Sequence, residues 1–276
     1  MAFSRSQILE RLRVKIAARR PLIMGGAGVG LVAKIMDRAG IDAIMAYNTG
    51  PFRMDGHGSL AGYLAYGDAN QITLDLARKI VPVAPSTPVI GGIGAADPYR
   101  KIDDLIGAYL DLGYSGITNV PTAGIYDGAF RRQIDHTGLG YPEEVKLIRK
   151  CRDRDVFTLA YAFTPDEVRG VVEAGADVLG AHVGLTTGGT IGAAHALDLD
   201  VACNRVAELS AAAREIRRDV IVVAHGGPFE SPKEVQRCYE RTDVDGFLAA
   251  SSIERLPVEP LLTSVVESYR NLHLKR

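Results

Sequence analysis

The stretch that decides the fold is Val220-Ile221-Val222-Val223-Ala224-His225-Gly226-Gly227, a β-branched run that stops at a histidine and two glycines. Four residues later, Ser231-Pro232-Lys233-Glu234 combines a hydroxyl cap, a proline at the first helical position and an acid in the first turn. A buried strand followed by a helix start makes one β/α unit. We find the same unit eight times along the chain.

The other units lie on both sides of this stretch. The eight expected strands are residues 21–24, 42–46, 89–90, 116–118, 156–161, 178–181, 220–224 and 246–250. Their runs are apolar almost throughout, which is typical of parallel strands buried on both faces. Eight units of the same sense favour a closed (β/α)8 TIM barrel over an open doubly wound sheet.

Amphipathic segments separate the strands. The expected helices cover residues 29–39, 102–112, 142–152 and 200–216, begin near residues 70, 164 and 231, and include a final helix, 258–269, that closes the ring. An extra helix over residues 4–18 precedes the first strand and is expected to cap the barrel floor. We find no linker, so residues 1–276 are expected to form a single domain with residues 1–20 as an accessory N-terminal helix.

Composition excludes several classes of function. The chain has 276 residues, 47% of them hydrophobic, and a net charge of -1. A near-neutral chain without aromatic and basic interleaving is not expected to bind nucleic acid, and the first twenty residues lack the apolar core of a signal or membrane span. Cys151, Cys203 and Cys238 have no short-spaced pairing, which favours a reducing, cytoplasmic location.

Three connections are much longer than the others, and each follows the carboxyl end of a strand. They cover residues 49–69, 120–141 and 184–199. Because long connections in compact domains are usually functional, we expect them to form a wall and a lid over the barrel mouth. From this lid, Arg131 or Arg132 is expected to close over an anionic ligand.

Small residues at the strand ends favour anion binding. In many barrels, backbone N–H groups after strands seven and eight hold a phosphate. The residues expected to do so here are Gly226, Gly227, Ser251 and Ser252, together with the strand-end glycines Gly25, Gly26 and Gly92. Glycine and serine also form ordinary turns, so a purely structural interpretation stays open.

Polar side chains at four strand ends are the candidate catalytic residues. His182 and His225 end neighbouring strands and are expected to transfer protons, while Asn48 and Asn119 are expected to orient a carbonyl or carboxylate. A less favoured interpretation has His182, His225 and Glu254 binding one divalent metal ion. The cofactor therefore stays unknown.

Several loop motifs carry a family resemblance. Tyr66–Asn70, Thr87–Gly92 with Asp97-Pro98, Asn119–Thr122 with Asp127-Gly128, and Thr137–Tyr141 together resemble the phosphoenolpyruvate hydrolase-like TIM barrels, which also occur fused to a Tm-1-type ATP-binding domain. The resemblance covers nearly the whole chain beyond Ile8 and implies hydrolysis of a phosphoenolpyruvate- or phosphonopyruvate-type substrate. Relatives that act on phosphonopyruvate place aspartates at the end of the third strand and use a Lys-x-Cys-x-Ser loop. Here that strand ends in Gly91-Gly92, with Asp97 further along, and the loop motif is absent.

The strand-end residues predict a small anion in the barrel mouth, and the resemblance implies a hydrolase that acts on a phosphorylated or phosphono keto-acid-type anion. Two alternatives are a non-catalytic barrel that senses a metabolite and a metal-dependent carbon–carbon lyase. A homo-oligomer is also expected, because the final helix carries more apolar residues than one core-facing stripe requires: Leu261, Leu262, Val265 and Val266.

Overall fold

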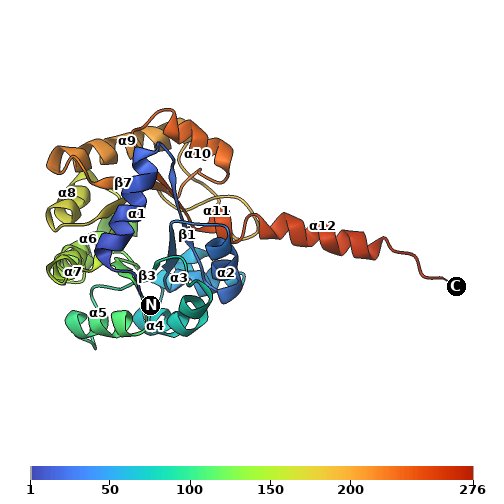
Figure 1. The fold of residues 1–276 in the computed structure, drawn as a ribbon, viewed down its shortest axis with the longest axis horizontal. Helices are drawn as coiled ribbons and strands as arrows, with labels where there is room; N and C mark the ends of the chain where they lie inside the picture. The colour runs from blue at the N-terminus through green and yellow to red at the C-terminus, as the bar shows by residue number, and fades with distance from the viewer. Residues whose placement is uncertain (1, 276) are drawn as a thin grey trace.

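Eight parallel strands close a barrel in the computed structural model, which describes residues 2–275 (Figure 1). Each strand pairs with the next, and β8 pairs with β1. The strands are β1 (Leu22–Gly26), β2 (Ala43–Ala46), β3 (Val89–Gly92), β4 (Gly116–Thr118), β5 (Phe157–Ala162), β6 (Val178–His182), β7 (Ile221–His225) and β8 (Gly246–Ala249). The predicted TIM barrel is confirmed.

Helices follow the strands. Each expected helix begins within one residue of its predicted start, and those with a predicted end also end within one residue of it. These helices are α1 (Arg5–Ala17), α2 (Gly30–Arg38), α4 (Ala69–Ile80), α5 (Ile102–Asp111), α7 (Tyr141–Asp153), α8 (Pro165–Glu173), α9 (Leu199–Ile216), α10 (Pro232–Tyr239) and α12 (Val258–Arg270). None of the helices between residues 2 and 275 has both the length and the apolar character needed to cross a membrane.

The long connections contain further short helices. The first holds α3 (Thr49–Met54) and η1 (Ser59–Tyr63), and the second holds η3 (Ala123–Ile125) and α6 (Gly128–His136). The third, residues 183–198, has neither helix nor strand. Two more short helices, η2 (Val81–Val83) and α11 (Ser251–Glu254), follow α4 and β8.

The barrel interior follows the two-residue period of its strands. Leu22 and Met24 of β1, and Ile221 and Val223 of β7, join one buried cluster inside the barrel. The apolar side of α1, Ile8 to Leu12, belongs to the same cluster, so this helix closes the barrel floor as predicted. Ser4 and Gln7 form a capping box that fixes the start of α1.

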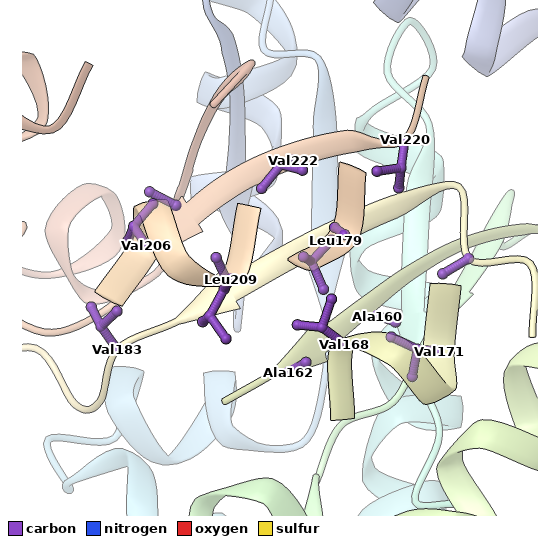
Figure 2. Packing of buried hydrophobic residues seen from close by; sticks show 14 of the residues in the cluster. Ala160, Ala162, Val168, Val171, Leu179, Val183, Val206, Leu209, Val220 and Val222 are labelled. Atoms are coloured by element: carbon purple, nitrogen blue, oxygen red, sulfur yellow. The ribbon is translucent and has the colours of Figure 1, made fainter. Parts of the chain in front are cut away.

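The residues of opposite parity pack outward against the helices. Figure 2 shows this layer around β5 to β7, where Leu179 and Val222 of the strands face Val168 and Leu209 of α8 and α9. A matching layer covers β2 to β4 on the other side of the barrel. Burial on both faces explains why the strand sequences lack an alternating polar pattern.

The final helix departs from its prediction. We expected residues 258–269 to close the ring, and this is wrong, because α12 has no buried residue and extends away from the barrel (Figure 1). The short α11 occupies the place after β8 and contacts β1. Arg255 and Glu259 bind the 183–198 loop at the start of α12.

Candidate functional site

A cavity of about 250 Å³ opens at the carboxyl ends of the strands, and we call it the mouth cavity. Strand ends supply its base, where Tyr47, Tyr161, His182 and His225 face inward. The first and third long connections supply its walls, from Thr49 to Tyr63 and from Gly184 to Ala193. The second long connection adds Val120, Thr122 and Ile125, so all three connections border the cavity, and their action as a lid stays a prediction.

The two histidines lie next to each other because β6 and β7 are paired in register. His182 is the direct partner of His225, and their ring centroids are 4.6 Å apart. The strand period directs both rings inward, since Val178 and Ile221, each four residues earlier, point into the barrel. Phe163 stacks on the ring of His182 at 4.2 Å, which fixes its orientation.

Backbone hydrogen bonds set different proton positions on the two rings. His225 Nδ1 lies 2.8 Å from the carbonyl oxygen of Leu248, which only accepts, so Nδ1 carries the proton and Nε2 has a free lone pair. His182 Nδ1 instead accepts from the amide of Gly184 at 3.0 Å, so its proton sits on Nε2. Neutral imidazoles of this kind offer one proton acceptor and one proton donor side by side.

Both imidazoles are held neutral by their surroundings. Burial lowers the pKa of His225 to about 4. Burial, and then the nearby His225, lower the pKa of His182 well below its ordinary value. At neutral pH the pair is therefore available for general base and hydrogen-bond donor roles.

Arg53 enters the mouth cavity from α3. Its side chain is buried, with Nε 2.8 Å and Nη2 2.7 Å from the same oxygen of Glu254, whose side chain is also buried. Arg53 Nη1 donates to Thr49 at 2.9 Å, and the backbone amide of Gly28 donates to the other oxygen of Glu254. Glu254 thus holds the guanidinium in place.

Arg255, directly after α11, lines the same cavity. Its Nη1 donates to the carbonyl oxygen of Gly188 at 2.9 Å and lies 3.0 Å from Glu259. Glu259 in turn accepts from the amide of Thr190 at 2.7 Å. Arg255 therefore joins the third long connection to the start of α12 while facing the cavity.

Two buried hydrogen-bond donors around this cavity have no partner: Arg255 Nε and the hydroxyl of Tyr161. Arg53 Nη2 is likewise without a hydrogen bond, although it lies 2.7 Å from Glu254 in the ion pair. Unpaired buried donors are uncommon and costly in folded proteins. Among residues 2–275, two arginines and no aspartate or glutamate line the mouth cavity. This donor set fits the oxygen atoms of a small anion.

The structure separates the four candidate catalytic residues into two pairs. His182 and His225 line the mouth cavity, whereas Asn48 and Asn119 do not. The asparagines have the outward parity of their strands, because Tyr47 and Val120 beside them point inward. Asn119 instead joins β4 to β5 through both backbone groups of Tyr161, and Asn48 donates to the carbonyl oxygen of Gly62.

Among the small residues expected to bind the anion, Ser251 lines the mouth cavity. The others lie outside its lining: Gly25, Gly26, Gly92, Gly226, Gly227 and Ser252. A side chain at Gly26 would reach Arg53, and one at Gly92 would collide with Tyr47. The amide of Gly227 is already used, because it donates to the carbonyl oxygen of Gly184 at 2.9 Å.

The charged residues expected at the lid are also engaged elsewhere. Arg131 pairs with Glu167 at 2.8 Å and with Asp135 at 3.0 Å, and Arg132 is exposed on α6. Neither lines the mouth cavity, where Arg53 and Arg255 take the expected position. Arg53 was visible in the first long connection, but nothing in its sequence context separated it from other loop arginines.

The fold and this cavity define a TIM-barrel protein with a candidate ligand site at the carboxyl ends of its strands. A family model described as phosphoenolpyruvate hydrolase-like matches residues 7–272, and the chain belongs to that family. The chain is 42% identical over 272 residues to the ToMV resistance protein Tm-1(GCR237) of Solanum lycopersicum, covering 98% of this chain and 36% of that protein. It therefore spans little more than a third of the length of this curated relative.

Solved structures of enzymes share the fold. Phosphoenolpyruvate phosphomutase from Streptomyces platensis subsp. rosaceus matches with a TM-score of 0.61 at 14% identity, over 95% of this chain and 86% of that one. A phosphonopyruvate hydrolase in complex with oxalate and Mg²⁺ matches with a TM-score of 0.57 at 17% identity, over 96% and 87% of the two chains. At these identities the likeness concerns the fold.

The residues of the mouth cavity do not fit a bound Mg²⁺ ion. Mg²⁺ prefers carboxylate and water oxygens, and no carboxylate among residues 2–275 lines this cavity. Glu254, considered with His182 and His225 as a metal ligand, has one oxygen on Arg53 and the other on Gly28. No group of three His, Cys, Asp or Glu side chains in residues 2–275 is placed to hold a metal ion.

Proposed function

We propose that this protein is a hydrolase that binds a small phosphorylated or phosphono keto-acid-type anion in the mouth cavity. The observation that carries the proposal is that Arg255 Nε and the Tyr161 hydroxyl are buried donors without a partner, in the same cavity that Arg53 lines. Acceptor oxygens of a carboxylate, phosphate or phosphonate supply the missing partners. The family and the enzymes that share its fold support the same class of ligand.

The histidine pair provides the acid–base chemistry in this proposal. His225 Nε2 takes a proton from a water molecule as the water oxygen bonds to the phosphorus or acyl carbon. The scissile bond breaks with its electron pair passing into an enolate on the keto oxygen. The enolate then takes the proton from His225 Nε2, which returns the imidazole to its neutral form. His182 Nε2–H and the two arginines hydrogen-bond the oxygens on which negative charge develops.

Ligand binding tests the arginine assignment. Replacing Arg255 with methionine is expected to weaken the binding of phosphonopyruvate and oxalate about 10- to 100-fold, because a hydrogen bond to a charged group is lost. Isothermal titration calorimetry measures this change. Arg78→Met, on the exposed side of α4, is the matched control and leaves affinity unchanged. If Arg131→Met weakens binding 10- to 100-fold and Arg255→Met does not, the anion is bound by Arg131 of the lid and the assignment to Arg255 is wrong.

Turnover separates an enzyme from a sensor. With a hydrolysable phosphono or phosphorylated keto acid, His225→Asn is expected to lower the rate about 100- to 10,000-fold while binding persists. Phosphate release by the unaltered protein is the reference. Binding of the ligand without phosphate release in that protein favours the metabolite-sensing alternative.

The cytoplasmic location stays a prediction that agrees with three buried, unpaired cysteines.

We also propose that the protein forms a homodimer through α12. The exposed face of this helix carries Leu261, Leu262, Val265 and Val266 at helical spacing. Leu31 and Ile35 form an exposed pair one turn apart on α2. This helix follows β1, and β1 is the neighbour of β8 in the barrel. A second copy related by a two-fold axis covers both patches, with α12 of each copy on α2 of the other.

Glutamate placed in the apolar face of α12 tests the dimer. Leu262→Glu is expected to convert a dimer to a monomer in light scattering at micromolar concentration, because a charge is then buried in the interface. Val201→Glu, on the exposed side of α9, serves as the control and keeps the dimer. A monomeric unaltered protein at the same concentration contradicts the proposal.

A further inference from the structure

A second, larger cavity lies beside the mouth cavity, and we call it the side cavity. Its volume is about 700 Å³, and it opens between the start of α4, the loop after β3 and helix α6. Tyr63 and Thr122 line both cavities, so the two adjoin at these residues, which we call the partition. The mouth cavity alone holds a pyruvate-sized anion, and nothing in the proposed reaction uses the side cavity.

The side cavity has an apolar, aromatic lining. Tyr99, Phe130 and Leu139 are large side chains exposed by 91%, 62% and 51%. Tyr126 packs edge-to-face with Phe130 at 5.2 Å and with Tyr63 at 6.0 Å, so the aromatic wall continues to the shared partition. Large apolar side chains gathered around one opening indicate a binding site, and aromatic faces and edges suit a planar ring.

The ionisable groups of the side cavity already have ionic or hydrogen-bond partners. Arg100 lies 2.5 Å from Asp68 and 2.7 Å from Asp97. Glu144 accepts from Thr122 at 2.7 Å and from the amide of Ala123 at 2.6 Å, and burial raises its pKa to about 8. Since these groups need no further partner, the part of a ligand that enters the side cavity is uncharged.

We infer that the anion bound in the mouth cavity carries an uncharged apolar group, best a ring, that passes the partition of Tyr63 and Thr122 into the side cavity. The inference rests on the proposed function and deepens it. The mouth cavity holds the acidic head, where Arg53 and Arg255 lie, and the side cavity selects the substituent. The substrate class is then an aryl- or bulky alkyl-substituted oxo acid rather than an acid of pyruvate size.

Matched pairs of acids test this division of the ligand. By calorimetry, 2-oxo-4-phenylbutanoate is expected to bind about 10- to 100-fold more tightly than pyruvate, because the side cavity removes one ring from water. In Phe130→Ala the gain from the ring shrinks to a few-fold, while the affinity for pyruvate is unchanged. Phe130 is exposed, so this variant is expected to fold. Leu112→Ala, an exposed leucine outside both cavities, keeps the full gain.

Further measurements separate the possible failures. In Arg255→Met the affinities for both acids are expected to fall by the same factor, because both acids bind through the same oxo-acid group. Binding of both acids with no gain from the ring overturns the inference and leaves the proposed function standing. Absence of binding by either acid overturns both. Binding of the neutral ring compound 4-phenylbutan-2-one as tightly as the aryl acid shows an independent site and overturns the inference.

Discussion

Replacing Glu254 by glutamine is expected to lower the free energy of unfolding by about 3 to 5 kcal/mol, because Arg53 then stays charged and buried without its counter-ion. Both side chains are almost completely enclosed, with exposed fractions of 2% and 0%. Thr49, which accepts from Arg53 Nη1, is neutral and does not replace the lost carboxylate. Urea unfolding at pH 7 measures the effect.

Two further variants show whether the ion pair is responsible. The double variant Arg53→Met with Glu254→Gln removes both charges, and it is expected to recover much of the lost stability. Glu259→Gln breaks the more exposed pair with Arg255 and is expected to cost less than about 1 kcal/mol. A loss below 1 kcal/mol in Glu254→Gln contradicts the role given to this pair. A loss in the double variant as large as in the single one does the same.

The sequence was sufficient to predict the barrel because each strand and helix has a local sequence signal. The run 220–224 is β-branched and uninterrupted, and Ser231-Pro232 marks the helix start with a cap and a fixed backbone angle. The final helix shows the limit of this reasoning. The apolar stripe of residues 258–269 predicts that this face packs against another protein surface. It does not show whether that surface belongs to the same chain or to another one.

The site was predicted less completely, and strand parity explains most of the difference. His182 and His225 are even steps from the inward residues Val178 and Ile221, so they reach the mouth cavity. Counting in the same way from the interior residues Met45 and Val120 directs Asn48 and Asn119 outward. Strand ends alone, without parity, do not distinguish the two sets.

The arginines of the mouth cavity were not predictable in this way. Arg53 and Arg255 lie beyond the strands, on α3 and directly after α11, where the strand period no longer applies. Their positions depend on contacts between distant segments, as in the pairing of Arg53 with Glu254 across 201 residues. Local sequence patterns carry no information about such a pairing.

Acid is expected to destabilise this protein through His225, by about 3 kcal/mol between pH 7 and pH 4. Burial lowers the folded-state pKa of His225 to about 4, whereas the unfolded chain protonates near its ordinary value of 6.5. The unfolded state therefore binds the proton first. This contribution is present in full above pH 6.5 and is lost as the pH falls toward 4. Urea unfolding of the unaltered protein and of His225→Asn at several pH values gives the difference attributable to His225.

The comparison with His225→Asn is necessary because Glu144 changes the stability with pH in the opposite direction. Burial raises its folded-state pKa to about 8, so its contribution is most favourable below pH 4.5 and is lost as the pH rises toward 8. Between pH 4.5 and 6.5 the two groups partly cancel in the unaltered protein. Glu144→Gln is therefore expected to give a difference curve of opposite sign to that of His225→Asn. If the His225→Asn difference stays constant from pH 7 to pH 4, the imidazole is not held neutral, and its assignment as the proton acceptor of the mouth cavity is wrong.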